Sequence, residues 1–336
     1  MSAKFIPLRT SVIAFVLVLL SASRLLATSV DTIKVQGTAI RQDTITSLIA
    51  TRLINRDFND IYTQNLRSSM FGNEYFQKVK TQLVADVVAN FVVYSTPKSR
   101  LFINAFTRVK IRLLATPGAP VKSPSYMPGI QLFYRLNHDV YHPEFLSGGY
   151  THHSNGVRGP TVLPDGSFNA DSGKFSTNFY TLNYTVGKRT DKTDRIINQY
   201  KTVGVELHSG LFGKGYATGL PGKYGWVRVN GSYMLNIAKS YEDPIKKDSK
   251  LFENWQRLQL DFTYIADKYN GYGTLDIKKR LNIGLKYYYH LPFLKDVAVM
   301  GGGGYRGQDD YNFSFQDSYG YVTVGLASGL SFLLSR

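Results

Sequence analysis

The chain has 336 residues, of which 43% are hydrophobic and none is cysteine, and its formal net charge is +16. The length predicts one large domain, and the lack of cysteine excludes a disulfide framework. The positive charge does not indicate a nucleic-acid partner, because no basic stripe interleaves with aromatic residues on an exposed surface.

The N-terminus has the features of an export signal. Lys4 and Arg9 precede the apolar run SVIAFVLVLLSAS, and small residues follow it up to Ala27. This order is typical of a secretory signal peptide, and the run is too short to span a bilayer comfortably. We expect residues 1–27 to be a signal peptide, cleaved after Ala27 or after Ser23.

Residues 28–77 follow no single period. The stretch DTITSLIATRLINRDFNDIYTQNLR mixes some helical spacing with polar residues. We expect an N-terminal extension here, which could be a periplasmic segment, a plug of the lumen or partly disordered.

From about residue 78 onward, apolar and polar residues alternate with a period of two. In residues 279–291, Leu281, Ile283 and Leu285 fall on one face, and Asn282 and Lys286 fall on the other. Such alternation predicts strands with one oily and one wet face. It recurs in about eleven segments, and an even total would require one more: 83–95, 100–114, 130–137, 146–154, 175–187, 200–212, 224–237, 254–265, 279–291, 295–305 and 321–334.

The length of these segments indicates a membrane barrel. They run to about ten residues or more, whereas strands of soluble sandwiches are usually about 5–6 residues long. Short links such as STPKSR and LPFLKD, expected in the periplasm, alternate with long loops such as 155–174, expected outside the cell. The predicted fold class is all-β, a transmembrane antiparallel β-barrel of about twelve strands over residues 78–336, closed because hydrocarbon offers no partner to backbone groups. The competing interpretation is a secreted all-β domain.

Many basic residues fall on the wet faces of these segments. Arg108, Lys110 and Arg112 alternate with Val109 and Ile111. We expect a lumen lined by cations, with further cations in loops that face anionic lipid headgroups.

The stretch GGYTHHSNG departs from the alternation. His152 and Ser154 share the oily face with Tyr150, and Asn178 lies on the oily face of the next segment. Burying each of these polar groups without a partner costs about 1–3 kcal/mol. We therefore expect the three to bind one another, while His153 points into the lumen as a bystander.

A hydroxyl, an imidazole and an amide in contact form a nucleophilic site. Positions i and i+2 of one strand, with a residue of its neighbour, can supply the geometry. We predict Ser154 as the nucleophile, His152 as its general base and Asn178 as the group that orients the imidazole. The competing interpretation is that all three bind lipid headgroups or water at the membrane interface.

These residues carry a resemblance to a known family. YTHHSNG followed by STNFY resembles the active-site region of the outer-membrane phospholipase A family, whose pattern is His, any residue, Ser-Asn-Gly, and then an Asn at the start of the next strand. SPSYMPGIQLFY at 123–134, with Met127 in place of the usual Glu, and GYRGQDDYNFSFQ at 304–316 are also similar to family segments. With QKVKTQLVADVV at 77–88, the likeness extends from about residue 77 to the C-terminus. It implies calcium-dependent hydrolysis of phospholipid acyl esters by a homodimer in the outer membrane of a Gram-negative cell.

The resemblance implies further site residues. Gly156 falls where a backbone N–H faces the oxyanion, and the carbonyl of Val157 falls where a calcium ligand is expected. The loop that follows is longer here than in the family, so Asp171, Ser172 and Asp165 are all candidates for the side-chain ligand of calcium.

The longer loop also makes Asn169 a rival of Asn178, although the alternation and the following FYTLNYTV favour Asn178. The family's tryptophans at the dimer contact are replaced by Ile111 and Arg112, which departs from the family pattern.

The alternative function is a non-catalytic outer-membrane barrel, either a porin or a structural protein. A structural barrel would need long loops, for which 155–174 and 187–200 are the candidates. His138 and His142 in NHDVYH could share a metal only on a helix. The stretch predicts a turn, so zinc is not indicated.

Overall fold

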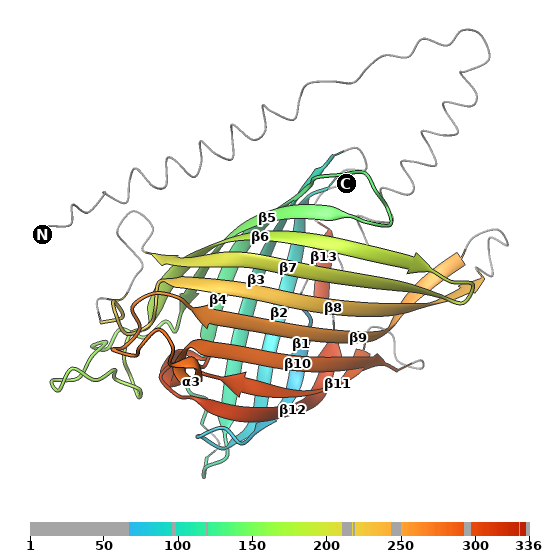
Figure 1. Cartoon of the computed structure of the whole chain (residues 1–336). Helices are drawn as coiled ribbons and strands as arrows, with labels where there is room; N and C mark the ends of the chain where they lie inside the picture. Colours follow the sequence, from blue (N-terminus) through green and yellow to red (C-terminus); the bar gives the residue numbers. More distant parts are fainter. Residues whose placement is uncertain are drawn as a thin grey trace, which may run out of the picture. The chain divides into compact units, whose positions relative to one another are not determined.

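The computed structural model describes residues 67–95, 99–118, 120–209, 217, 219–242, 250–291, 297–328 and 330–333. The predicted signal peptide, and the predicted extension up to residue 66, lie outside these residues. The described chain forms one continuous sheet (Figure 1). Its strands are β1 Ser69–Tyr75, β2 Thr81–Tyr94, β3 Leu101–Leu114, β4 Ser125–Arg135, β5 Glu144–Ser154, β6 Ser176–Asp191, β7 Arg195–Ser209, β8 Val227–Glu242, β9 Lys250–Ile265, β10 Leu281–His290, β11 Val297–Arg306, β12 Tyr319–Ser328 and β13 Leu330–Leu333.

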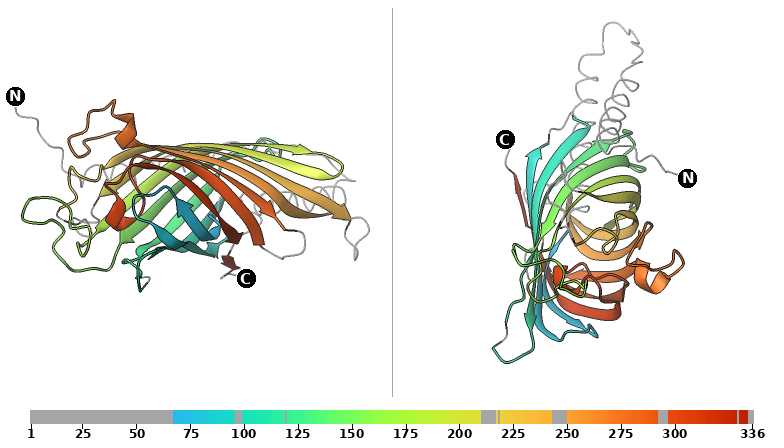
Figure 2. Two further views of the ribbon diagram at one scale, coloured as in Figure 1. Left: turned by 90° about the horizontal axis from the view of Figure 1, so that it is seen from below. Right: turned by 90° about the vertical axis from the view of Figure 1, so that its left-hand side faces the viewer.

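The sheet closes into a barrel. Neighbouring strands from β1 to β12 pair antiparallel, and β1 pairs with both β12 and β2. The short β13 continues from β12 and pairs parallel with β2 over residues 89–92, beyond the reach of β1. Figure 2 shows the closed wall along the barrel axis. The predicted antiparallel barrel of about twelve strands is confirmed.

The barrel begins earlier than predicted. β1 lies inside the segment 28–77 that was expected to be an extension, so the predicted start at residue 78 is wrong. Phe71 and Tyr75 face outward and Glu74 faces inward, but the apolar Met70 on the inner face and the central Gly72 obscure the alternation in the sequence SMFGNEY. Gly72 lies so close to β12 that a Cβ there would overlap the carbonyl oxygen of Val324.

The period of two matches the inner and outer walls. In β5, Thr151 and His153 are buried inside, whereas Tyr150, His152 and Ser154 lie on the outer wall. The outer wall exposes large apolar side chains, namely Ile130, Leu132, Val203, Val205, Leu207, Val229, Phe262, Ile283, Leu285, Val322, Val324 and Leu326.

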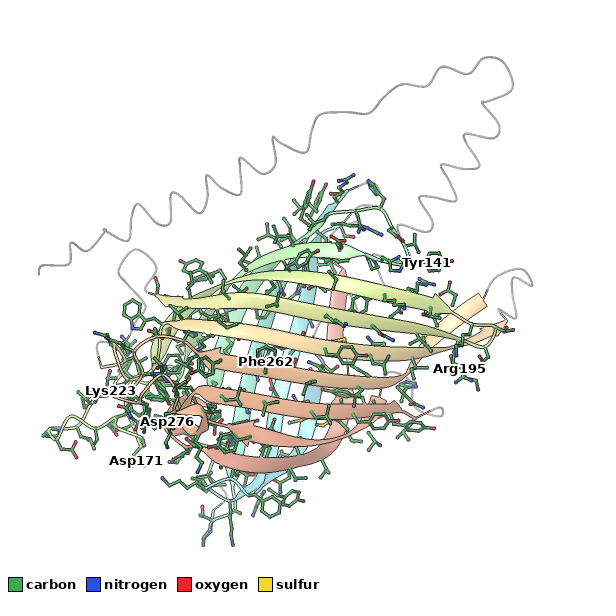
Figure 3. The ribbon with its side chains drawn as sticks, in the orientation of Figure 1. Tyr141, Asp171, Arg195, Lys223, Phe262 and Asp276 are labelled. Atoms are coloured by element: carbon green, nitrogen blue, oxygen red, sulfur yellow. The ribbon has the colours of Figure 1, made fainter. Side chains whose placement is uncertain are left out.

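The two ends of the barrel differ. The connections after β5, β7, β9 and β11 gather at one end, called here the loop end, where Asp171, Lys223 and Asp276 lie in Figure 3. Tyr141 and Arg195 mark the opposite turn end. The segment 187–200 is no long loop, because β6 runs to Asp191 and β7 begins at Arg195. Within the described part of the chain, no helix is long and apolar enough to cross a membrane.

Side chains fill the lumen near the loop end. An apolar cluster, called here the loop-end cluster, joins three connections and consists of Phe168, Phe175, Ala217, Leu220, Tyr224, Phe313 and Phe315. The connection 307–318 between β11 and β12 contains the short 3-10 helix η1 Asn312–Ser314. Its buried residues include Asp309, Tyr311 and Asn312, so this connection folds inward and is called here the inward loop.

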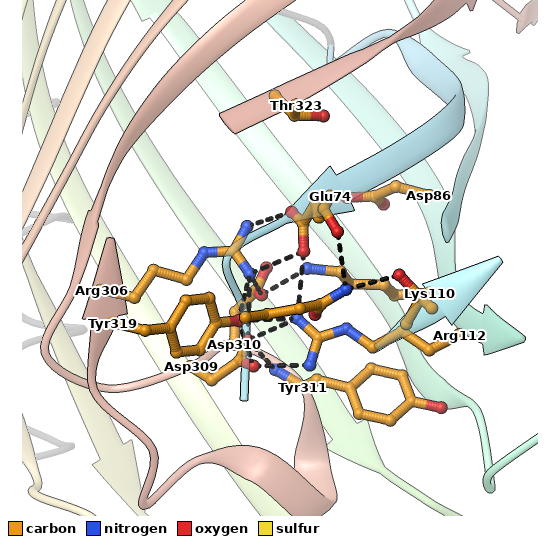
Figure 4. Close-up of polar contacts among 12 residues, drawn as sticks. Glu74, Asp86, Lys110, Arg112, Arg306, Asp309, Asp310, Tyr311, Tyr319 and Thr323 are labelled. Atoms are coloured by element: carbon orange, nitrogen blue, oxygen red, sulfur yellow. Dashed lines mark hydrogen bonds and ion pairs between the residues drawn. The ribbon is translucent and has the colours of Figure 1, made fainter. Parts of the chain in front are cut away.

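Charges bind the inward loop to the wall (Figure 4). Asp309 accepts hydrogen bonds from Arg112 Nη1 at 2.6 Å and Arg306 Nη1 at 3.1 Å. Asp310 accepts from Lys110 Nζ at 2.6 Å and Arg108 Nη2 at 2.9 Å. Burial alone would raise the pKa of Asp310, but the neighbouring Lys110, Arg306 and Arg108 cations hold it well below its usual range. The predicted inward cations are therefore paired with acids.

Candidate active site

The outer wall near the loop end brings together residues of three strands. His152 of β5 lies directly opposite Asn178 of β6, and Ser154 lies opposite Ser176. On the other side of β5, Tyr126 of β4 lies opposite Ser154. The antiparallel register therefore places the predicted histidine and asparagine on adjacent strands at the same height.

A hydrogen bond joins this histidine and asparagine. His152 Nδ1 lies 2.7 Å from Asn178 Oδ1, and the Tyr150 hydroxyl donates to the same oxygen at 2.9 Å. An amide oxygen only accepts hydrogen bonds, so His152 carries its proton on Nδ1 when neutral. Its Nε2 is then left with a free lone pair, as a general base requires. Asn178 is 2% exposed although it faces outward, so water does not compete for its oxygen.

Ser154 shares the outer face of His152 but is not bonded to it. Among the described residues, no hydrogen bond joins the Ser154 hydroxyl to the imidazole. Positions i and i+2 of a strand are about 6.6 Å apart, which an imidazole ring and a hydroxyl can span. Catalytic hydrogen bonds are often long without substrate and tighten when it binds. The structure thus assembles the imidazole–amide pair and places the hydroxyl beside it.

The turn after Ser154 offers a backbone donor. Gly156 has a φ of 70°, in the left-handed region that favours glycine. The N–H of Asn155 donates to the Phe175 carbonyl at 3.2 Å, and the N–H of Val157 donates to Asn155 Oδ1 at 3.2 Å. Of these three consecutive N–H groups, only that of Gly156 makes no hydrogen bond within the described residues.

Asn155 locks this turn to the end of the same loop. Besides receiving the Val157 N–H, its Oδ1 accepts the Phe175 N–H at 3.0 Å, and its Nδ2 donates to the Gly173 carbonyl at 2.8 Å. Asn155 is 2% exposed. Sequence reasoning missed its role, although its place within Ser-Asn-Gly was a usable signal. It also missed the hydrogen bond from Tyr150 to Asn178, because a tyrosine on the outer face has no feature that sets it apart.

The rival Asn169 has a different place. Its Oδ1 accepts the backbone N–H groups of Asp171 and Ser172 at 3.3 and 3.1 Å, and its Nδ2 donates to the Pro160 carbonyl at 3.3 Å. It therefore shapes the loop, whereas Asn178 contacts the histidine.

The resemblance implies few calcium donors, and Val157 and Ser172 among them lie in the loop between β5 and β6. The loop segments that carry Val157 and Ser172 run side by side, since the Lys174 N–H donates to the Gly159 carbonyl at 3.1 Å. The Asp171 side chain is 94% exposed, and its one ion pair among the described residues is with Lys122, at 3.6 Å. Within the described residues, no three or more His, Cys, Asp or Glu side chains lie together as a metal cluster. Calcium takes about 6–8 oxygens, so water would have to supply most of the ligands if these donors held the ion.

The third candidate, Asp165, lies in the tight turn 163–167 of the same loop. Its carboxylate accepts from the N–H and the hydroxyl of Ser167 at 2.9 and 2.7 Å. These two hydrogen bonds lower the pKa of Asp165.

A second chain of hydroxyl, imidazole and carboxylate lies on the inner wall. Thr177 Oγ1 is 3.1 Å from His208 Nδ1, and His208 Nε2 is 2.5 Å from Glu206 Oε1. Thr177 is fully buried and Tyr224 of the loop-end cluster covers the His208 ring, with 5.1 Å between ring centroids. A substrate ester has no access to this hydroxyl, so this chain is not a second active site.

His153 and Arg112 both point into the lumen. His153 is 4% exposed and its ring lies against Phe175, with 4.7 Å between centroids. Arg112, which stands where the resemblance expects a dimer-contact tryptophan, is 4% exposed and bonded to the inward loop. It is therefore not available to a partner chain.

No family model matches the chain, and no curated protein matches it. Among solved structures, outer membrane phospholipase A from Escherichia coli is similar, with 14% identity and a TM-score of 0.48 over 80% of this chain and 98% of that one. The outer membrane phospholipase of Salmonella typhi, solved as a dimer with bound calcium, has 12% identity and a TM-score of 0.46 over 78% and 90%. The β domain of the Bordetella autotransporter BrkA has 10% identity and a TM-score of 0.32 over 79% and 100%. These values record a likeness between barrels and assign no residue in this chain.

Proposed function

We propose that the protein is an outer-membrane phospholipase that hydrolyses acyl esters with a Ser154–His152–Asn178 triad on its outer wall. The observation that carries the proposal is the 2.7 Å contact between His152 Nδ1 and Asn178 Oδ1 on an otherwise apolar face. A bystander pair at the lipid interface has no need of a serine two residues away on the same face. Membership of the outer-membrane phospholipase A family is part of the proposal.

The chemistry follows from the positions of the groups. His152 Nε2 accepts the Ser154 proton as the Ser154 oxygen attacks the ester carbonyl, and Asn178 holds the imidazole in the required tautomer. The Gly156 N–H donates to the oxyanion that develops. His152 then returns the proton to the leaving alcohol, and water hydrolyses the acyl-enzyme by the same route. Calcium bound by the Val157 carbonyl, Asp171 and Ser172 would add positive charge beside this pocket.

The outer wall supports a membrane location. Val203 is 56% exposed and Leu285 46% exposed, and both belong to a wall of large apolar side chains. Soluble proteins rarely expose an apolar surface that extends over many strands. In a bilayer this wall contacts acyl chains, so the lipid substrate reaches Ser154 without leaving the membrane.

The described part of the lumen argues against the porin alternative. A porin needs a water-filled channel, whereas here the loop-end cluster and the inward loop occupy the barrel interior. The acids of the inward loop neutralise cations that would otherwise line a pore. The proposed chemistry therefore uses the outer wall.

Release of fatty acid from a short-chain phospholipid by the purified, detergent-solubilised barrel tests the proposal. We expect turnover that saturates with substrate. No release above the detergent control, from protein that resists unfolding when unheated on a denaturing gel, would leave the non-catalytic barrel as the better interpretation.

Replacing Asn178 with alanine is expected to reduce kcat by about 10- to 100-fold. A neutral amide orients the imidazole but cannot offset its positive charge, so its loss should lower kcat less than the loss of His152, which is expected to cost about 10⁴-fold or more. Initial rates with the short-chain phospholipid give the value. An inactive Asn169→Ala beside a fully active Asn178→Ala would show that the other asparagine orients the base.

Removing calcium is expected to bring turnover to background. The site supplies few protein ligands, so we expect activity to return at about 10⁻⁴–10⁻³ M free calcium, the range of weak extracellular sites. Titrating calcium into chelated wild type and Asp171→Asn gives the comparison, and the variant should need more calcium. Full activity in excess chelator would exclude a metal requirement. Sedimentation of the same samples tests whether the active protein is a homodimer, as the family resemblance implies.

A further inference from the structure

One peptide group in the turn after Ser154 is held from outside the turn. Ser123, just before β4, donates from its hydroxyl to the carbonyl oxygen of Asn155 at 2.5 Å. The peptide group between Asn155 and Gly156 is planar and trans, so its C=O and N–H point in opposite directions. A hydrogen bond that fixes this carbonyl also fixes the direction of the Gly156 N–H.

The Gly156 N–H is the donor that the proposed chemistry needs. The N–H groups of both neighbours are engaged, by the Phe175 carbonyl and by Asn155 Oδ1. Glycine itself restricts rotation of this peptide less than any other residue would. The direction of the donor therefore depends on what holds the carbonyl.

Ser123 is itself held by the inward loop. The Tyr311 hydroxyl donates to the Ser123 carbonyl at 2.9 Å, and Asn312 Nδ2 donates to the same oxygen at 3.1 Å. Asn312 is fully buried, and its N–H also donates to the Ser125 hydroxyl at 3.1 Å. The neighbouring Asp309 and Asp310 tie the inward loop to four cations of the wall. The lumen therefore supports a residue that reaches the active-site turn.

We propose that Ser123 is a positioning residue, which aims the Gly156 N–H at the oxyanion and is held in place by Tyr311 and Asn312 of the inward loop. The proposal rests on the proposed hydrolase function, which supplies the oxyanion. In this proposal, contacts inside the lumen support a donor that acts on the outer wall.

Replacing Ser123 with alanine is expected to reduce kcat about 10- to 100-fold with KM unchanged. The donor stays present but loses its fixed direction, so the loss should be smaller than the about 10²–10³ for removing such a donor outright. Ser123→Thr keeps the hydroxyl and should restore most of the rate. Ser99→Ala is the matched control, because the Ser99 hydroxyl holds a turn at the turn end, 2.9 Å from the Leu101 carbonyl.

Wild type, Ser154→Ala and the Ser123 variants are assayed together, with urea unfolding midpoints for each. A normal kcat in Ser123→Ala, when Ser154→Ala is inactive, would overturn the positioning role and leave the hydrolase function intact. A lowered midpoint with no rescue by Ser123→Thr would show that Ser123 only stabilises the fold. Equal turnover by wild type and Ser154→Ala would instead remove the hydrolase function itself.

Discussion

Replacing Ser154 with alanine is expected to reduce phospholipid hydrolysis by about 10⁴-fold or more, to the level of the detergent control. Removal of a triad nucleophile or its base leaves only the residual effect of binding and the oxyanion donor. His152→Asn should have the same effect, because its amide cannot accept the Ser154 proton at neutral pH. Both variants should keep the heat-modifiable gel mobility of the barrel, since strand pairing uses neither side chain.

The inner wall supplies the matched controls for this prediction. His153 stands between the two residues in sequence, but its side chain points into the lumen and does not reach the reacting atoms. His153→Asn should therefore leave the rate within about twofold of wild type. Thr177→Val removes the hydroxyl of the buried chain that ends at Glu206 and should also remain active. Loss of activity in these variants, with Ser154→Ala active, would show that the active site lies in the lumen and not on the outer wall.

The period of two explains why most of the barrel could be predicted from the sequence. One face of each strand meets the apolar exterior and the other meets a polar interior, so parity alone placed His152 and Ser154 outside and His153 inside. The pattern was hard to detect at β1, where the apolar Met70 faces inward and Gly72 interrupts the strand. Glu74 on its inner face accepts from Arg306 at 2.6 Å and from Arg112 at 3.2 Å, and these partners lie 232 and 38 positions away in sequence, so nothing local indicates them.

The site was predictable where strand register decides it and not where loops do. Asn178 follows from counting along two adjacent strands, because antiparallel pairing places it opposite His152. Asn155, Ser123 and Asn312 lie in connections, where no period relates sequence to position. The cations of the wet faces were predicted, but the inward loop that neutralises them was not, and a plug of the lumen was named only as one option for residues 28–77. The composition of an aromatic, acidic connection between two strands does not indicate whether it extends outward or folds inward.

Replacing Asp309 with alanine is expected to destabilise the barrel by about 3–5 kcal/mol, the usual cost of leaving a buried charge without its partner. Its side chain is fully buried and accepts from Arg112 at 2.6 Å, from Arg306 at 3.1 Å and from the Tyr319 hydroxyl at 2.6 Å. Without it, Arg112 keeps Glu74 at 3.2 Å, and Arg306 keeps Glu74 at 2.6 Å and Asp310 at 3.4 Å. The free energy of unfolding, measured by urea titration in lipid vesicles, gives the value.

Asp317→Ala is the control for this loss, because Asp317 is in the same connection but its partner Lys78 is 75% exposed. Exposed pairs are worth about 0–1 kcal/mol, so this variant should unfold almost as the wild type does. Equal, small effects of the two substitutions would mean that water reaches Asp309 and that the inward loop does not seal the lumen. We expect a large loss of stability in Asp309→Ala alone. If the inward loop also supports the active-site turn through Tyr311 and Asn312, the fraction of this variant that stays folded should have a lower kcat than wild type.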